Sequence, residues 1–354
     1  MATDRNDLVR EVLSINPTPE SPRNSEGDII ALRHPPAGGL LLAYTHFTAG
    51  SHDNSAAYIA ARYSSDEGRT WVEDQVLLAR EGEMNSMSVS LLRLSSGPLA
   101  IFYLVKNSTL DCRLFMRTSN DQARSWSDAL CATPAPGYHV VNNARVVQLS
   151  SGRLVVPAAL HEWRSETARI EPGRAMCFLS DDMGKTWRRS KTVLEPPAGS
   201  GSGLQEPGVI ELRSGALFML CRTDLGVQYR SHSQDGGDTW SPAQPTNIAS
   251  PCSPATLRRI PKTGELLIIW NDHAKPYDHL GQKRTPLATA ISRDEGNTWT
   301  NRKILEDDPD GWFCYTSCTF VGEHALLSYC AGGKDVGRLN RLRVMRIHTS
   351  WFLS

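Results

Sequence analysis

The sequence has 354 residues, of which 40% are hydrophobic and 21% charged, which is the composition of an ordinary globular protein. Its 38 Lys and Arg residues balance 38 Asp and Glu residues, so it lacks the positive field that binding to nucleic acid or to an anionic membrane needs. Its apolar runs, such as residues 266–270, are about one strand long and far shorter than the roughly 20 residues that cross a bilayer.

The first element expected along the chain is a strand over residues 8–15. It follows a polar segment without the apolar region of a secretory leader, which predicts a cytoplasmic protein. Hairpins follow, each an apolar run, a Gly turn and a second apolar run. Their turns are expected at Gly39, Gly97, Gly152, Gly215 and Gly264, with a sixth near Gly322.

A short segment with Ser, Asp, Gly, Thr and Trp in fixed positions follows five of these hairpins. The copies occupy residues 64–71, 119–126, 180–187, 233–240 and 292–299. The second copy has Ala123 in place of Gly and Ser125 in place of Thr. Ser and Asp cap a tight turn, Gly adopts a positive φ, and Trp packs between units. We therefore interpret the segments as structural and assign none of their residues to a site.

The repeat length predicts the architecture. Trp residues of successive segments are 55, 61, 53 and 59 residues apart, so the chain accommodates six units of about 57 residues. About four strands per unit, without helical periodicity, predict one all-β domain over residues 1–354, a six-bladed β-propeller with four-stranded antiparallel blades. The last unit lacks an outer strand, and the segment at 8–15 is expected to complete it and close the ring.

The five segments resemble the Asp-box repeats of sialidases, a family of six-bladed propellers, and the resemblance covers essentially the whole chain. It implies a catalytic Glu at Glu206 and an Arg at Arg222 in the fourth blade. It also implies a second Arg at Arg284, before the fifth Asp box, and a nucleophilic Tyr at Tyr315 in the sixth blade. Asp53, in the loop before the first Asp box, matches the position of the family's acid/base Asp.

The chemistry of a sialic acid explains this set of residue types. Its anomeric carbon bears a carboxylate, which would repel a carboxylate nucleophile but not a neutral Tyr315 that Glu206 activates. Arg222 and Arg284 would bind the acid group in bidentate geometry, while Asp53 would protonate the leaving oxygen and then activate water. This scheme needs no metal or organic cofactor, and the scattered Cys residues have no metal-ligand spacing.

One position departs from the family pattern. The family's clamp has three arginines, the first of them on the inner strand of blade one, but the equivalent run at 27–32 contains Asp28. Either Arg23 or Arg145 could supply the third guanidinium, and we favour Arg145 because it begins an inner strand in the run 142–147.

Three further polar residues are expected to contact the sugar. Asn85 opens the inner strand of blade two, Lys106 ends the strand after it, and Asn143 precedes Arg145. These positions would face the central pocket of a propeller.

The sequence thus predicts an exo-α-sialidase-like glycoside hydrolase that releases a terminal sialic acid with retention, and its partner would be a sialylated or other acidic glycan. Asp28 favours a first alternative, a glycosidase or lyase for another acidic sugar. The second alternative is a non-catalytic propeller that binds carbohydrate or protein.

Overall fold

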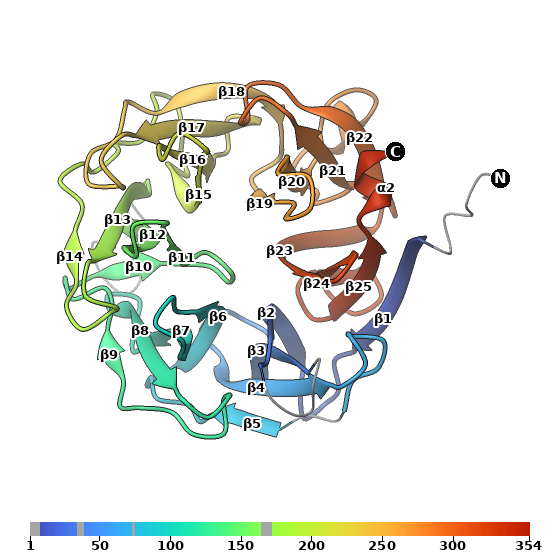
Figure 1. The fold of residues 1–354 in the computed structure, drawn as a ribbon. Helices are drawn as coiled ribbons and strands as arrows, with labels where there is room; N and C mark the ends of the chain where they lie inside the picture. The colour runs from blue at the N-terminus through green and yellow to red at the C-terminus, as the bar shows by residue number, and fades with distance from the viewer. Residues whose placement is uncertain (1–7, 34–38, 73–74, 164–171) are drawn as a thin grey trace.

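The computed structural model of the protein describes residues 8–33, 39–72, 75–163 and 172–354. These residues form sheets of strands that succeed one another along the chain and surround a central axis (Figure 1). The helices whose bounds lie within these residues are the 3-10 helix η1 (Tyr277–Leu280) and α2 (Ser350–Leu353). Neither is long or apolar enough to span a membrane. The predicted all-β fold is confirmed.

Four sheets have four antiparallel strands each, as predicted. The first contains β2 (Arg23–Ala31), β3 (Leu40–Ala49), β4 (Ala56–Ser64) and β5 (Gln75–Leu78). The second contains β15 (Gln205–Glu211), β16 (Leu217–Arg222), β17 (Val227–Ser233) and β18 (Gln244–Ala249). The third contains β19 (Thr256–Arg259), β20 (Leu266–Asn271), β21 (Leu287–Ser292) and β22 (Thr300–Glu306).

The fourth of these sheets joins the two ends of the described chain. Its order is β1 (Val9–Ile15), β25 (Leu342–His348), β24 (His324–Gly333) and β23 (Gly311–Val321). β1 runs antiparallel to β25, with Val9 opposite Ile347 and Ile15 opposite Leu342. The segment expected at 8–15 therefore forms the outer strand of the last sheet.

The remaining sheet has nine strands in two groups. The first group is β6 (Asn85–Arg93), β7 (Leu99–Lys106), β8 (Cys112–Ser119) and β9 (Leu130–Cys131). The second is β10 (Tyr138–Val140), β11 (Val147–Gln148), β12 (Leu154–His161), β13 (Arg174–Ser180) and β14 (Arg188–Arg189). One parallel pair, Tyr138 with Cys112, joins the groups.

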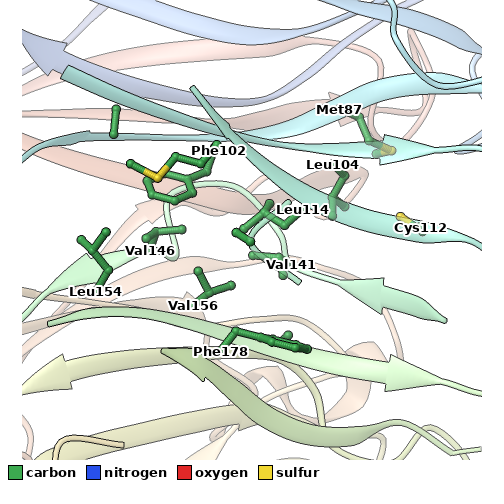
Figure 2. Close-up of a cluster of buried hydrophobic side chains, with 14 of the residues drawn as sticks. Met87, Phe102, Leu104, Cys112, Leu114, Val141, Val146, Leu154, Val156 and Phe178 are labelled. Atoms are coloured by element: carbon green, nitrogen blue, oxygen red, sulfur yellow. The ribbon is translucent and has the colours of Figure 1, made fainter. Parts of the chain in front are cut away.

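The hydrophobic core lies between neighbouring groups of strands. The cluster in Figure 2 packs side chains of β7 and β8, such as Phe102 and Leu114, against Val156 of β12 and Phe178 of β13. Similar clusters fill the other boundaries, and one of them packs Leu42 of β3 against strands of the last sheet. Burial of these apolar faces holds adjacent sheets together around the axis.

The five Asp boxes form turns with the same hydrogen bonds. In the fourth box, Ser233 Oγ donates to Asp235 Oδ1 at 2.8 Å and accepts from Gly237 N at 2.9 Å. Thr239 donates its N–H to Oδ1 and its hydroxyl to Oδ2 of Asp235 at 2.9 and 2.6 Å. The other four boxes repeat these bonds. Their residues close turns, as their side-chain chemistry predicts.

Candidate active site

Four inner strands carry a bulge near their first residues. The register shifts by one residue between Ser25 and Asp28 of β2, Met87 and Ser90 of β6, Gln205 and Gly208 of β15, and Cys314 and Ser317 of β23. One residue of each bulge has a positive φ: Glu26 at 54°, Ser88 at 57°, Glu206 at 45° and Tyr315 at 58°. These four residues line a single cavity. The bulges thus place four different side chains in one site.

This central cavity has a volume of about 530 Å³ and two chemically different walls. One wall is charged and includes Glu26, Asp53, Glu206, Arg222 and Arg284. The other wall comes from β6, β7, β8 and β10 and is mostly apolar, with Met87, Leu104, Cys112, Tyr138 and Val140. Such a cavity suits a ligand that carries a negative charge at one end and an apolar group at the other.

Tyr315, Glu206 and Arg222 form a chain of hydrogen bonds at the centre of the charged wall. Tyr315 Oη donates to Glu206 Oε1 at 2.9 Å, and Arg222 Nη1 donates to Glu206 Oε2 at 2.7 Å. Burial alone would raise the pKa of Glu206, but the charges of Arg222 and Arg284 and these hydrogen bonds lower it overall. Burial and the Glu206 carboxylate raise the pKa of Tyr315. Glu206 therefore holds Tyr315 as a neutral phenol whose proton points at a base.

Arg222 and Arg284 have donors left for an anion. Arg222 Nε donates to Cys252 Sγ at 3.1 Å, and Arg284 Nη1 donates to Cys314 Sγ at 3.2 Å. Thiols are weak acceptors, and Arg284 Nε has no partner among the described residues. The Arg284 guanidinium also lies over the Tyr315 ring, 5.2 Å from its centroid. Both arginines thus retain capacity to bind a carboxylate beside the Tyr315 hydroxyl.

Asp53 lies against Arg23, the less favoured candidate for the third arginine. Arg23 Nη1 donates to Asp53 Oδ1 at 2.5 Å, and Nη2 donates to Glu26 Oε1 at 2.9 Å. Arg23 is only 1% exposed, whereas the Asp53 side chain is 63% exposed. Desolvation would raise the pKa of Asp53, but Arg23, with Lys106 and Arg284, lowers it overall. Burial raises the pKa of Glu26 against the opposing effect of Arg23.

Arg145, the favoured candidate, lies elsewhere. Its Nε donates to Asn142 Oδ1 at 2.9 Å and its Nη1 to Ala255 O at 2.8 Å, and its side chain does not line the central cavity. Burial, followed by the charge of Arg258, lowers its pKa to about 10. Neither arginine lines the cavity, but Arg23 pairs with two carboxylates that do, Asp53 and Glu26, so the geometry favours Arg23 over Arg145 as the third arginine.

Asn85 and Lys106 hold the loop that carries Asp53. Asn85 Nδ2 donates to the carbonyls of Asp53 and Ser55 at 2.9 and 3.0 Å, and Lys106 Nζ donates to the Asp53 carbonyl at 3.1 Å. Of the two, only Lys106 lines the cavity, with its ammonium 5.0 Å from the Tyr138 ring centroid. Through these bonds both residues position the loop, a role that was not predicted from the sequence.

Asn143 bridges two inner strands. Its Nδ2 donates to Gly27 O at 2.7 Å and to Tyr315 O at 2.9 Å, and its side chain is outside the cavity lining. It therefore contacts the main chain of Tyr315 and Gly27, not the space that a ligand would occupy.

Glu26 and His161 both line the cavity but were not predicted from the sequence. A bulge leaves no clear mark in a sequence, so Glu26 could not be placed there. His161 had a signal, since it ends the second strand of its hairpin just as Lys106 and Arg222 do. Burial lowers the pKa of His161 to about 4, so it lies in the cavity wall as a neutral imidazole. Among the described residues, no group of three or more His, Cys, Asp or Glu could hold a metal ion.

Comparisons with known proteins show which sequences this chain resembles. The BNR repeat-like domain matches residues 38–327. The sialidase of Micromonospora viridifaciens is 26% identical over 340 residues, covering 84% of this chain and 49% of that protein. The anhydrosialidase of Macrobdella decora is 28% identical over 223 residues, covering 58% of this chain and 27% of that protein. The chain therefore spans about half the length of these curated relatives, or less.

Solved structures share the fold at low sequence identity. A protein of unknown function from Dyadobacter fermentans has a TM-score of 0.75 at 18% identity, covering 96% of this chain and 99% of that one. The NanB sialidase of Streptococcus pneumoniae has a TM-score of 0.71 at 14% identity, covering 97% and 71%. A leech intramolecular trans-sialidase has a TM-score of 0.72 at 15% identity, covering 97% and 70%. The chain belongs to the BNR repeat-like domain family, within the sialidase superfamily.

Proposed function

We propose that this chain is an exo-α-sialidase that removes a terminal sialic acid with retention of configuration. The observation that carries the proposal is the bond from Tyr315 Oη to Glu206 Oε1, with Arg222 on the other carboxylate oxygen. A phenol hydrogen-bonded to a carboxylate, between two arginines with donors to spare, suits attack on an anomeric carbon that bears an acid group. The curated relatives named sialidase support the same substrate class.

The first chemical step forms a glycosyl–tyrosine bond. Arg222 and Arg284, with Arg23, bind the substrate's carboxylate. The Tyr315 oxygen bonds to the anomeric carbon as the glycosidic bond breaks, and the phenol proton passes to Glu206. Once the substrate's negative charge offsets Arg23, Asp53 takes up a proton from water and gives it to the departing oxygen. Because the substrate's negative charge offsets the arginines that lower the pKa of Glu206, Glu206 becomes a stronger base when substrate is bound.

The second step reverses these transfers. Water attacks the anomeric carbon, its proton passes to Asp53, and the bond to Tyr315 breaks as Glu206 returns the phenol proton. Two displacements at one carbon retain the configuration. The apolar wall with Met87, Leu104 and Val140 fits an acyl substituent of the sugar.

We also propose six blades for the ring. The nine-stranded sheet has a single residue pair between its two groups, so it counts as two blades beside the four four-stranded sheets. The hydrophobic clusters support this count because each packs adjacent groups together, and the largest of them also includes Phe47 and Ala57 of the first sheet. The β1–β25 pairing supports closure of one domain by the strand at 9–15.

The test is release of a fluorescent aglycone from its α-sialoside by wild-type protein and by Tyr315→Phe. Tyr329→Phe is the matched control, because the Tyr329 hydroxyl also donates to a carboxylate, that of the half-buried Glu306, but lies outside the central cavity. We expect Tyr315→Phe to lose turnover and Tyr329→Phe to keep it. Equal turnover in both variants would reject the tyrosyl mechanism.

Product analysis decides between the proposal and its neighbours. NMR of the first sugar released distinguishes retention from inversion, and it also distinguishes free sialic acid from the internal anhydro sugar of an intramolecular transfer. Turnover of a uronic acid glycoside, with none of the sialoside, would point to the other acidic-sugar alternative. No turnover on any of these substrates would favour a binding propeller.

A further inference from the structure

Of the three arginines proposed to bind the substrate's carboxylate, Arg23 alone does not line the central cavity. Arg222 and Arg284 line the cavity directly, while the Asp53 carboxylate, which does line it, lies on Arg23 Nη1 at 2.5 Å. Asp53 thus separates the Arg23 guanidinium from the space that a ligand would occupy.

The Arg23 guanidinium itself is fixed. Its Nε donates to Ser25 Oγ at 2.9 Å, its Nη2 donates to Glu26 Oε1 at 2.9 Å, and the Phe47 ring centroid lies 4.5 Å from its Cζ. Nη1 is the corner of the group that meets Asp53, and it also donates to the Ser51 carbonyl at 3.3 Å. A ligand carboxylate can reach this guanidinium only where the Asp53 carboxylate now lies.

The Asp53 carboxylate can move away from Arg23 while the main chain of its loop stays in place. Asn85 and Lys106 hold its backbone carbonyl, so the main chain is anchored, whereas its side chain is 63% exposed. Rotation about its side-chain bonds suffices to move the carboxylate off Arg23. Since Glu26 also pairs with Arg23, a third carboxylate would meet like charge unless Asp53 moved away.

We propose that Asp53 is a specificity-determining residue as well as the acid/base, because its carboxylate occupies the substrate's place on Arg23 until an acidic sugar displaces it. This inference rests on the proposed function. An anionic sugar takes over Arg23 and frees Asp53 to meet the leaving oxygen. A neutral sugar of the same shape leaves Asp53 on Arg23, away from that oxygen. The site then selects acidic sugars at the proton-transfer step as well as at binding.

The exchange is tested by the affinity of an unhydrolysable sialic acid, the 2,3-didehydro analogue, for wild type, Asp53→Asn and Asp53→Ala, measured by calorimetry. The Asp53 carboxylate competes with the ligand for Arg23, so the measured affinity is reduced to the fraction of protein molecules in which Arg23 is free. Removing this carboxylate should therefore tighten binding about fivefold or more. Asp53→Ala should gain more than Asp53→Asn, whose amide oxygen still accepts from Arg23. Unchanged or weaker affinity in both variants would overturn the proposal.

Two controls separate charge exchange from a general opening of the loop. Thr48→Ala changes an exposed residue at the base of the same loop, outside the cavity lining, and should leave affinity unchanged. The methyl ester of the same analogue has no carboxylate and should gain nothing from either Asp53 variant. An equal gain for the ester would show that Asp53 blocks the site by its bulk alone, and would overturn the exchange.

A crystal structure of the ligand-free protein gives a readout that needs no substrate. The Asp53 carboxylate should lie on Arg23, and a carboxylate turned away from Arg23 would overturn the exchange whatever the reaction is. If the analogue binds to no form of the protein while the pair is present, the proposed sialidase function fails and the pairing of Asp53 with Arg23 stands.

Discussion

The Asp boxes and the bulges of the inner strands are both repeated around the ring, but they differ in what is repeated. In the boxes the side chains recur with the backbone, and five copies make the same hydrogen bonds. In the bulges only the backbone recurs, with positive φ at Glu26, Ser88, Glu206 and Tyr315. Repetition of side chains thus marks stabilising structure, and repeated geometry with different side chains marks the site.

The largest effect on turnover is expected for Glu206→Gln, which changes a bulge residue and leaves the Asp boxes intact. It removes the base that faces Tyr315 and the counter-charge of Arg222, so turnover should fall about 10²- to 10⁴-fold. Initial rates on the α-sialoside measure this loss. Glu211→Gln, on the same strand, is the control, because Glu211 accepts from Ser150 outside the cavity. If Glu206→Gln kept wild-type turnover, the proposed catalytic role of the bulge residues would be contradicted.

As the pH falls, the contribution of the cavity-wall residue His161 to the free energy of unfolding should be lost before the contributions of the Asp-box carboxylates. His161 has its pKa lowered to about 4 by burial, so the unfolded chain takes up a proton first as the pH falls from 6.5. Its contribution to the free energy of unfolding is therefore present above pH 6.5 and is lost by about pH 4, a change of about 3 kcal/mol. Box residues such as Asp235, with a pKa of about 2, contribute above pH 4 and lose that contribution only toward pH 2.

Urea unfolding at a series of pH values tests this order. Between pH 6.5 and 4, wild type should lose about 3 kcal/mol more of its free energy of unfolding than His161→Gln loses, and both should share the more acidic limb. Burial raises the pKa of Asp28 to about 6, and this opposing effect is present in both proteins. A slope between pH 6.5 and 4 that His161→Gln does not change would assign the acid sensitivity to other groups.

Asp235→Ala should lower stability and spare turnover. Asp235 accepts bonds from Ser233 and Thr239, and their loss should cost about 2 kcal/mol, or about 3 °C in Tm. Differential scanning calorimetry measures this shift beside Gln234→Ala, which replaces the exposed neighbour. A fall in turnover at unchanged Tm would show that the boxes serve the reaction and would break the contrast.

The same contrast explains what the sequence could predict. The hairpins, the boxes and the all-β fold were predictable because local residue types dictate those turns. Glu206, Arg222, Arg284 and Tyr315 were placed by the family resemblance, and the structure brings them together in one cavity.

Arg23 was harder to place than Arg145. The bulge between Ser25 and Asp28 changes which residues of β2 face the axis, and no residue type announces it. Asp28, which stands where an Arg was expected, instead accepts the Leu91 and Ile29 N–H groups. Asn85 and Lys106 contact a loop backbone, a partner that sequence patterns do not identify.

Ala123→Gly should have the smallest effect and the opposite sign. Ala123 occupies the Gly position of the second box with a φ of 70°, where the other boxes have Gly at 80–91°. A left-handed Ala costs about 1–2 kcal/mol, which glycine would recover. Loss of a buried methyl group and a more flexible unfolded chain offset most of this gain, so the net stabilisation should be about 0.5 kcal/mol by urea unfolding.

The reverse substitution in the fifth box, Gly296→Ala, makes the comparison two-sided. A Cβ there would lie 3.0 Å from Phe218 Cε1, at a φ of 91°, so it should destabilise by more than Ala123→Gly stabilises. If Ala123→Gly instead destabilises the protein, the packing of the Ala123 methyl group stabilises the fold by more than the left-handed backbone of Ala123 costs. The second box would then be adapted to its neighbours, and the rule that identical side chains mark the stabilising repeat would hold for only four of the five copies.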